Sequence, residues 1–425
     1  MTVLILAIMV ICAICGAPLF VFFGGLALLL FAHNGIDTSA VIIEMYRMAS
    51  APALVAIPLF TFAGYMMAES KTPARLVNFT RALVGWMPGG LAIVCLIACA
   101  FFTAFTGASG ITIIALGGLL YPVLIKEKYS ERFSSGLVTT SGSLGLLFPP
   151  SLPLILYGII ARVNIDELFM AGLIPGILLI IALSFYSIHS GIKTKVERQK
   201  FCLKEIKKTF WEAIWIVPLP LIILGGIYGG IFTASEAAAV TVVYVLFVEL
   251  VIYRDLKPFK DVPKIAADSM ILVGGVLIIL GCAMGLTNFL VDAEVPAKLI
   301  AFMRQHISSK YTFLMLLNVC LLIVGCLMDI FSAIIVVVPL ILPIASEFGV
   351  HPIHLGIIFL TNLEIGYSTP PVGLNLFISS YRLGKPISEL CRASLPFLLI
   401  FIICLFIITY VPDISLGLIQ LLKGG

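Results

Sequence analysis

Long apolar runs separated by short polar segments make up most of the chain. The first run, residues 3–32, contains no formally charged side chain. Several later runs also approach or exceed the roughly 20 apolar residues that a membrane-spanning helix needs. The pattern predicts an all-α, polytopic membrane protein.

The composition supports this class and excludes others. Of the 425 residues, 61% are hydrophobic and 11% are charged, and the mean hydropathy is +1.17. A soluble domain carries about 25% charged residues. The net charge of +4 says nothing about nucleic acid. Because no Gly-x-x-x-x-Gly-Lys-Ser/Thr motif occurs, we expect no direct binding of ATP.

Ten cysteines are present, nearly all within apolar runs. Cys12 and Cys15 have the spacing of a redox pair, but they lie inside a hydrophobic run without a βαβ context. We interpret them as small residues of helix packing. A membrane-embedded redox enzyme that uses this pair is kept as an alternative function.

Two hydrophobic segments are interrupted at their centres by adjacent prolines. Residues 142–158 contain Pro149-Pro150, and residues 364–380 contain Pro370-Pro371. Paired prolines cannot continue an α-helix, because they remove hydrogen-bond donors and clash with the preceding turn. Irregular backbone at membrane depth is tolerated only where protein or a water-filled cavity covers it. Two such breaks in corresponding halves of one chain point to the binding site of a secondary transporter.

The two breaks belong to an internal repeat. A shift of 221 positions takes Pro149 to Pro370, and four of the five prolines between positions 106 and 180 have a partner at this shift. Proline averages about 5% of residues, so chance is a poor explanation. The repeat predicts five segments: an N-terminal scaffold helix and interfacial arm (1–54), repeat one (55–190), a cytoplasmic arm with scaffold helices (191–269), repeat two (270–411) and a C-terminal tail (412–425).

Charged loops indicate the orientation, because loops rich in Lys and Arg stay in the cytoplasm. Four loops are basic and are predicted to be cytoplasmic: 71–81, 126–132, 193–208 and 254–264. The counterparts of the first two, 291–310 and 346–354, are mixed or acidic and are predicted to be external. The two repeats therefore have inverted topology, a common design among carriers.

The first two basic loops are predicted on one face, so the apolar segment between them must enter the membrane and return. In repeat one, we expect a re-entrant helical hairpin at 90–123, with its tip at 106–110, and a broken helix at 134–161. In repeat two, we expect a hairpin at 311–343, with its tip near 329–332, and a broken helix at 355–381. The alternative, one ordinary crossing per hairpin segment, would place two basic loops on opposite faces, against the charge rule.

A broken helix exposes free carbonyl groups at one cut end and free N–H groups at the other. The carbonyl end suits Na⁺, a hard cation that prefers oxygen, and the N–H end suits a carboxylate. The candidate Na⁺ ligands are Thr106, Gly107, Ser109, Ser143, Gly145, Asp329, Ser332, Gly366, Ser368, Thr369 and Pro370. The candidate substrate ligands are Ser109, Ser141, Ser368 and Asn375. Gly, Ser and Thr also line close helix contacts in membranes, and this alternative stays open for each residue.

Other polar residues in the apolar segments have weaker signals. Asp329 and Glu364 are acids inside hydrophobic stretches, which are costly and therefore functional by default, although Glu364 could equally be a structural acid. Asn362 could be a ligand or an interhelical contact. His351 and His354 have metal-like spacing, but two ligands are too few for a metal site.

Two segments outside the helical cores mix apolar and charged residues. Residues 33–50 contain Glu44 and Arg47 one turn apart, and residues 200–212 place Trp211 among lysines. Both are predicted to be interfacial amphipathic helices. For the second, a solvated loop is the alternative.

The tips, the double-proline breaks and the opening run that ends at 16–18 resemble the large membrane subunit of tripartite ATP-independent periplasmic (TRAP) transporters. The matching residues include 106–110 (TGASG), 147–151 (LFPPS) and 368–373 (STPPVG), and the resemblance spans essentially the whole chain. It implies a Na⁺-driven importer of organic acids, such as C4-dicarboxylates or sialic acid, in the bacterial inner membrane. It also implies a periplasmic substrate-binding protein and a small four-helix membrane subunit as partners, and a transport domain that moves as an elevator against a scaffold.

The prediction is therefore the carrier subunit of a Na⁺-coupled uptake system for a carboxylate, and not an enzyme. A self-sufficient Na⁺/dicarboxylate carrier and a passive channel are further alternatives. No extended basic cluster near the breaks distinguishes a dicarboxylate from a sugar acid.

Overall fold

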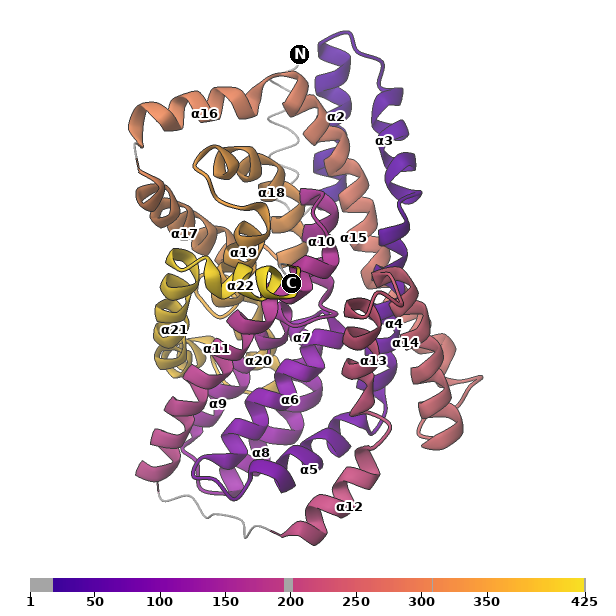
Figure 1. Cartoon of the computed structure of the whole chain (residues 1–425), viewed down its shortest axis with the longest axis vertical. Coiled ribbons are helices and arrows are strands. Elements are labelled where there is room, and N and C mark those ends of the chain that lie inside the picture. The colour runs from indigo at the N-terminus through magenta and orange to yellow at the C-terminus, as the bar shows by residue number, and fades with distance from the viewer. Residues whose placement is uncertain (1–17, 195–201, 308, 424–425) are drawn as a thin grey trace.

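The structure is a computed structural model that describes residues 18–194, 202–307 and 309–423. All of the secondary structure within these ranges is helical (Figure 1). Eight described helices are long and apolar enough to span a membrane, or up to ten spans if each of two bent pairs counts as one. The predicted all-α polytopic class is confirmed. Cys12 and Cys15 lie outside the described residues.

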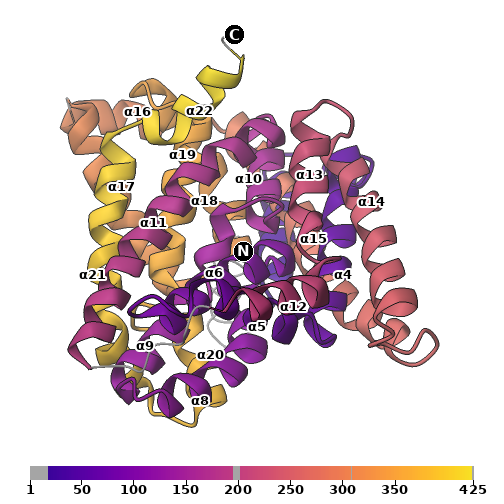
Figure 2. The ribbon, with the colours of Figure 1, turned by 60° about the horizontal axis from the view of Figure 1, so that its bottom comes forward.

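One group of helices, which we call the scaffold, is drawn on the right of Figure 1. It consists of α2 (Leu19–His33), α3 (Ser39–Ala49), the 3-10 turn η1 (Pro52–Val55), α4 (Ala56–Glu69), α13 (Pro218–Tyr228), α14 (Ala234–Phe247) with its π-helical extension η4 (Val248–Ile252), and α15 (Asp261–Asp292). Helix α15 packs against α2, α3 and α4, and α4 also packs against α14. Figure 2 again places α4, α13, α14 and α15 on one side of the molecule.

The first hairpin lies in the second group of helices and is slightly longer than predicted. It consists of α6 (Gly90–Thr106), α7 (Ser109–Thr112), the π-helical η2 (Ile113–Gly117) and α8 (Gly118–Lys126). An ion pair between Arg81 and Glu127 joins its two ends. Figure 1 shows α7 near the middle of the molecule, with α8 returning toward α5 (Thr72–Val84). The chain therefore enters and leaves this hairpin at one end.

The second hairpin consists of α17 (Lys310–Leu327) and α18 (Ile330–Glu347) and follows α16 (Val295–His306). Its ends are joined by an ion pair between Arg304 and Glu347. The Lys310 ammonium group also donates to the Gly349 carbonyl oxygen at 2.8 Å. The turn lies at 328–329, earlier than predicted, because Asp329 caps α18 and Ser332 already belongs to that helix. The hairpin thus spans 310–347 instead of 311–343.

Each broken helix is a pair of helices separated by an irregular segment with two prolines. The first pair is α9 (Glu131–Ser141) and α10 (Leu152–Ala161), with the 3-10 turn η3 (Leu144–Leu147) after α9 and a bend of 44°. The second pair is α19 (Pro352–Gly366) and α20 (Leu374–Leu383). The helices begin at 131 and 352 and the second ends at 383, so both pairs are longer than the predicted 134–161 and 355–381. Both Pro-Pro bonds are cis.

The two broken helices run in opposite directions. Where α9 begins and α20 has ended, the Lys385 ammonium group lies 2.8 Å from the Glu131 carboxylate. At the other end, the Tyr157 hydroxyl of α10 donates to the Pro352 carbonyl oxygen of α19 at 2.7 Å. Between these ends, the Ser143 hydroxyl lies 3.5 Å from the carbonyl oxygen of Glu364, its counterpart at the 221-residue shift. Contact between counterparts is expected at a two-fold axis between inverted repeats. The repeat itself stays a prediction that these contacts favour.

Four further helices complete the described fold: α11 (Ile165–Lys193), α12 (Leu203–Ala213), α21 (Ile387–Tyr410) and α22 (Asp413–Lys423). Helix α11 packs against α6, α19 and α21, and α22 packs against α11. The expected C-terminal tail therefore contains a packed helix. The segment boundaries expected at 190/191 and 269/270 lie inside α11 and α15.

The two amphipathic segments are helical over most of their length. Helix α12 packs against α5, while α3 lies lengthwise beside α15 in Figure 1. The Glu44–Arg47 ion pair in α3 measures 2.7 Å. The interfacial position of both helices stays a prediction.

The described residues of the basic loops lie toward one end of the molecule, drawn at the bottom of Figure 1. Ion pairs link the loop at 71–81 to Asp255 and to Glu127, and α12 packs on α5 between them. The predicted external loops meet instead at the other end, through Arg304 and Glu347. The structure therefore places the loops in the two groups that the charge rule predicted.

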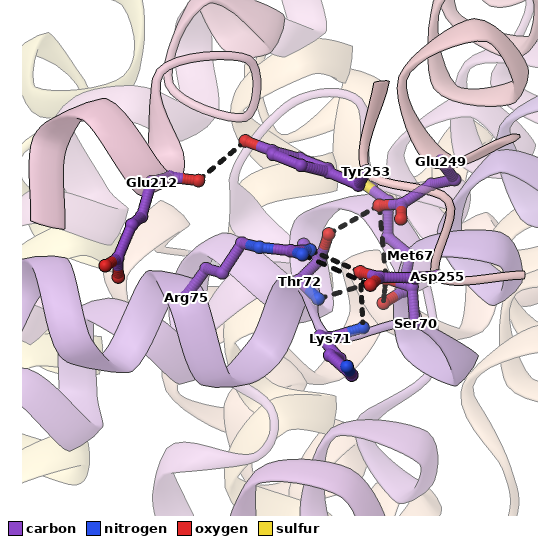
Figure 3. A network of polar contacts seen from close by, with 9 residues as sticks. All are labelled: Met67, Ser70, Lys71, Thr72, Arg75, Glu212, Glu249, Tyr253 and Asp255. Carbon is purple, nitrogen blue, oxygen red and sulfur yellow. Dashed lines mark hydrogen bonds and ion pairs between the residues drawn. The ribbon is translucent and has the colours of Figure 1, made fainter. Parts of the chain in front are cut away.

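A polar cluster joins α5 to the segment that follows η4 (Figure 3). The Asp255 carboxylate accepts hydrogen bonds from both terminal nitrogens of Arg75 and from the Lys71 backbone N–H, the latter at 3.3 Å. The Arg75 guanidinium carbon also lies 3.8 Å from the centre of the Tyr253 ring, a cation–π contact. These contacts attach the first turn of α5 to the scaffold.

A buried carboxylate completes the cluster. Glu249 in η4 is 1% exposed. It accepts hydrogen bonds from the Thr72 hydroxyl at 2.6 Å and the Ser70 hydroxyl at 3.1 Å (Figure 3). Because α5 leads from the scaffold to the first hairpin, the cluster determines where that connection begins.

Replacing Asp255 with Asn should destabilise the protein. The Asp255 side chain is 4% exposed and that of Arg75 is 18% exposed, and loss of one partner of a buried ion pair costs roughly 3 kcal/mol. We expect D255N to lower the Tm of the purified chain clearly. K208Q is the control, because the Lys208–Glu212 pair is long, at 4.0 Å, and exposed. Equal Tm values for the two variants would contradict a structural role of the cluster.

Candidate functional site

The tip of the first hairpin is a left-handed turn beside the first break. Gly107 has a φ of +65°, which glycine adopts without strain, and its N–H donates to the Thr103 carbonyl oxygen at 2.8 Å. A Cβ atom at Gly107 would lie 2.5 Å from the Cβ of Leu152, at the start of α10. Glycine is therefore required here for both conformation and space. Ala108 is extended, and Ser109 begins α7.

The tip of the second hairpin is formed by a helix cap. One Asp329 carboxylate oxygen accepts the Ser332 backbone N–H at 3.0 Å, and the other accepts the Ser332 hydroxyl at 2.5 Å. This satisfies donors at the start of α18 that no helical partner reaches. The Ile330 N–H donates to the Tyr367 hydroxyl at 2.5 Å. Tyr367 follows α19, so this bond attaches the tip to the second break.

The first break is packed tightly against the first hairpin. The Thr103 hydroxyl of α6 lies 2.7 Å from both the Gly142 carbonyl oxygen and the Thr112 hydroxyl. A Cβ atom at Gly145 would lie 2.2 Å from the Ala100 carbonyl oxygen. The Ser141 and Ser143 side chains are fully buried. The helix can therefore break here because hairpin side chains and backbone cover the irregular segment.

The second break is attached to the second hairpin through backbone groups. The Cys326 carbonyl oxygen accepts the N–H groups of Val372 and Gly373, at 3.2 and 3.3 Å. A Cβ atom at Gly366 would lie 2.4 Å from the Gly325 carbonyl carbon, so α17 and α19 touch through two glycines. Pro370 is exposed, whereas Pro149 in the first break is buried.

A cavity of about 370 Å³ lies between the two tips and the scaffold. The first tip contributes Gly107, Ala108 and Ser109, and the second contributes Asp329. The scaffold contributes Tyr65 from α4 and Leu272 from α15. Gly110, Tyr367 and seven apolar side chains complete the lining, the latter being Ile111, Ile114, Leu146, Ile330, Phe331, Leu374 and Ile378. A ligand in this cavity would touch both hairpins and the scaffold at once.

Several buried oxygen atoms of the hairpins and broken helices have no hydrogen-bond partner in the described part of the chain. They include the Ser109 hydroxyl, the Asn375 side-chain carbonyl and both carboxylate oxygens of Glu364. Buried polar atoms without partners are costly and call for an explanation, such as an ion. Oxygen atoms suit a hard cation such as Na⁺; of these residues, the sequence predicted Ser109 as a ligand of both Na⁺ and substrate and Asn375 as a substrate ligand. Within the described residues, no group of three His, Cys, Asp or Glu side chains could hold a transition metal.

The predicted ligands lie at different distances from the cavity. Gly107, Ser109 and Asp329 line it, and the Ser332 hydroxyl binds Asp329. The Thr106 hydroxyl donates instead to the Phe102 carbonyl oxygen at 3.1 Å. The others do not line the cavity and lie in the two breaks or at the helix ends beside them: Ser141, Ser143, Gly145, Gly366, Ser368, Thr369, Pro370 and Asn375. Their role as ligands stays a prediction.

Asn375 and Ser368 form their own contact in the second break. The Asn375 amide nitrogen lies 3.5 Å from the Ser368 hydroxyl, and the Asn375 N–H donates to the Tyr367 carbonyl oxygen at 2.9 Å. The Thr369 hydroxyl donates to the Ile365 carbonyl oxygen at 2.8 Å. These bonds shape the break.

Some residues that sequence reasoning weighed turn out to be structural. Asn362 donates to the Asn318 side chain of α17 at 2.8 Å, which makes it an interhelical contact. His354 is buried between the Thr409 carbonyl oxygen and the Ser415 hydroxyl, each at 3.2 Å. His351 accepts the Ile353 N–H at the start of α19.

Sequence reasoning missed Tyr65, Tyr367, Thr103 and Thr112. The two tyrosines reach the tips from other elements, and the two threonines hold the first tip to the first break. Thr103 and Thr112 lie four residues before and five residues after Gly107, and this proximity to the predicted tip could have indicated them. No local pattern marks the tyrosines.

The all-helical, multi-pass fold and a cavity enclosed by two hairpin tips are the features of a membrane transporter. A solved transporter structure, that of YdaH from Alcanivorax borkumensis, has the same fold, with a TM-score of 0.65 over 94% of this chain and 98% of that one at 16% sequence identity. The family model for the tripartite ATP-independent periplasmic transporter, DctM component, matches residues 3–414.

Curated relatives support the same assignment. The C4-dicarboxylate TRAP transporter large permease protein DctM of Pseudomonas aeruginosa is 37% identical over 93% of this chain and 92% of its own length. The isethionate TRAP transporter permease protein DctMQ of Oleidesulfovibrio alaskensis is 37% identical over 85% of this chain and 57% of its own length. The chain belongs to the DctM family of TRAP transporter large permeases, and it is a multi-pass inner-membrane protein.

Replacing Gly107 with Ala should damage the first tip, while Gly230→Ala serves as the matched control. Both glycines have a positive φ, +65° and +69°, so both alanines are strained by about 1 kcal/mol. Only at Gly107 would the new Cβ clash, because nothing lies within 4 Å of a Cβ at Gly230. We expect a Tm several degrees lower for G107A than for G230A. A smaller loss of Tm in G107A than in G230A would contradict the described tip.

Proposed function

We propose that this chain is the carrier subunit of a Na⁺-coupled system that takes up a small organic acid. The observation that carries the proposal is the cavity between the two tips, which touches both hairpins and the scaffold at once. A carrier needs such a site, because the bound substrate must contact both groups of helices that move relative to one another.

The charge of the cavity supports a coupling cation. No Lys, Arg or His is among the described residues that line it, whereas Asp329 adds an acidic group. An organic anion that leaves water for such a site needs a compensating charge. Na⁺ ions held by carbonyl and hydroxyl oxygens at the tips would supply that charge, and their binding would order the tips before substrate arrives.

For the substrate, we favour an acid of the C4-dicarboxylate size. The relatives with the most similar sequences reported above are named for C4-dicarboxylates and isethionate, both small organic anions. The mainly apolar lining suits a compact molecule whose charges are met at the tips. A sialic acid is the second candidate from the sequence.

The movement that we propose is an elevator motion of the hairpins and broken helices against the scaffold. The chain passes between these groups through three helices: α5 leads from α4 to the first hairpin, α12 precedes α13 after the first broken helix and α11, and α16 leads from α15 to the second hairpin. Helices α5 and α12 lie at one end of the molecule and α16 at the other (Figure 1). Such connections would keep the moving group attached while it slides.

A tripartite transporter needs partners, and we propose two, a periplasmic substrate-binding protein and a small four-helix membrane subunit. One relative carries the name DctMQ and is longer than this chain, which agrees with a second membrane component. A self-sufficient carrier and a passive channel are the competing functions. The redox alternative rests on Cys12 and Cys15 alone.

Loss of the Ser109 hydroxyl at the first tip, or of the Ser368 hydroxyl in the second break, should weaken Na⁺ binding. We expect S109A and S368A each to raise the Na⁺ concentration for half-maximal uptake in proteoliposomes by about fivefold, the effect of losing one polar contact worth about 1 kcal/mol. S346A is the control, because the Ser346 hydroxyl is exposed and bonds within its own helix. Na⁺ dependence unchanged in both S109A and S368A would remove these residues as ligands.

Uptake should also require the substrate-binding protein. Proteoliposomes that contain the membrane subunits are expected to accumulate labelled succinate only when the binding protein and a Na⁺ gradient are both present. Strong uptake without the binding protein would favour the self-sufficient carrier. Non-saturable flux that ignores Na⁺ would favour the channel.

A further inference from the structure

A second cavity, of about 570 Å³, lies at the basic end of the molecule, away from the tips. It is formed by the start of α9, the end of α11 and the start of α21. Helix α21 packs against both α9 and α11, and Figures 1 and 2 show the three helices on the side away from α13 and α14. None of the residues that line this cavity lines the cavity at the tips.

The lining of this cavity is basic. Arg132, His189 and Lys193 contribute side chains, and no carboxylate is among the described lining residues. All three side chains reach solvent. Hydroxyl groups of Ser190 and Thr194 add hydrogen-bond donors. Three basic groups and two hydroxyls around one cavity are suited to the oxygen atoms of a phosphate group.

Neighbouring acids do not neutralise this cavity. Glu131 is adjacent to Arg132 in sequence, but its carboxylate lies 2.8 Å from the Lys385 ammonium group. Glu389 also pairs with Lys385, at 2.6 Å. Lys385 thus occupies both acids. One terminal nitrogen of Arg132 donates to the Arg392 carbonyl oxygen at 3.1 Å, and no acid pairs with Arg132, His189 or Lys193 among the described ion pairs.

An apolar stripe leads from the membrane-spanning part of α11 into the cavity. Ile177, Ile181 and Phe185 are 47%, 48% and 70% exposed and follow one another at four-residue intervals. The same spacing continues to His189 and Lys193, so each side chain neighbours the next and the row winds gradually around the helix into the cavity. A second exposed apolar row on α21 contains Leu395, Leu399 and Ile403. The surface thus changes from apolar to basic where α11 leaves its span.

We propose that this cavity binds the phosphate group of an anionic phospholipid of the cytoplasmic leaflet, with the acyl chains along the apolar rows of α11 and α21. The basic loops place this end in the cytoplasm, where anionic headgroups attract Lys and Arg. A free phosphate would use the basic groups but not the apolar rows. The site is independent of the transport function proposed above.

The test measures the Tm of the full-length chain in a neutral detergent. Phosphatidylglycerol should raise the Tm to a plateau, and the midpoint is the lipid concentration that gives half of this increase. Phosphatidylcholine and inorganic phosphate at equal concentrations should leave the Tm unchanged. The variant R132Q/K193Q should need roughly twentyfold more phosphatidylglycerol, and K193Q alone about fivefold more, because each basic group near an anionic headgroup contributes about one such factor.

The matched control is K204Q/K207Q, which removes two exposed lysines of α12 at the same end of the molecule. Its midpoint should stay within about twofold of the unaltered protein, since neither lysine lines the cavity. The proposal is overturned if the control variant needs as much additional phosphatidylglycerol as the cavity variants do. It is also overturned if inorganic phosphate or phosphatidylcholine raises the Tm as phosphatidylglycerol does, or if K193Q, which changes one exposed side chain at a helix end, has no effect.

Discussion

Polar backbone groups in a membrane must find partners inside the protein, and this constraint shapes the centre of the molecule. The prolines leave each broken helix with backbone groups that have no partner within the helix. In the first break, the Thr103 hydroxyl meets the Gly142 carbonyl oxygen. In the second, the Cys326 carbonyl oxygen accepts two N–H groups. Each hairpin tip therefore covers the break of its own half, and neither could be stable in lipid alone.

The same arrangement creates a site with little positive charge. Hairpins that supply glycines, hydroxyls and backbone oxygens can hold a cation, but they offer an organic anion no basic side chain. An ion and a substrate that share such a cavity depend on each other electrostatically. This dependence is the physical basis on which we propose that Na⁺ drives uptake. Since Asp329 already caps α18, its charge is partly offset by the start of that helix.

Local rules were sufficient for the elements that border the site. Paired prolines marked both breaks. Basic loops indicated that the first hairpin begins and ends on the same side of the molecule, and the Arg81–Glu127 ion pair agrees with this. The lengths were less accurate, because hairpins and broken helices extend to caps and ion pairs that the apolar pattern does not contain. The C-terminal helix α22 was missed, since its stability depends on packing against α11.

By itself, the sequence determined the membrane class, the two breaks, the hairpins and the grouping of the loops, because chain length, proline chemistry and charge act locally. The tertiary structure decided which polar residues face the cavity. Ser109 and Asp329 line it, while Ser143 and Ser368 do not. It also brought in Tyr65 and Tyr367 from separate elements. The direction of a side chain depends on how helices pack against one another, and helix packing is not encoded in the local spacing of residue types.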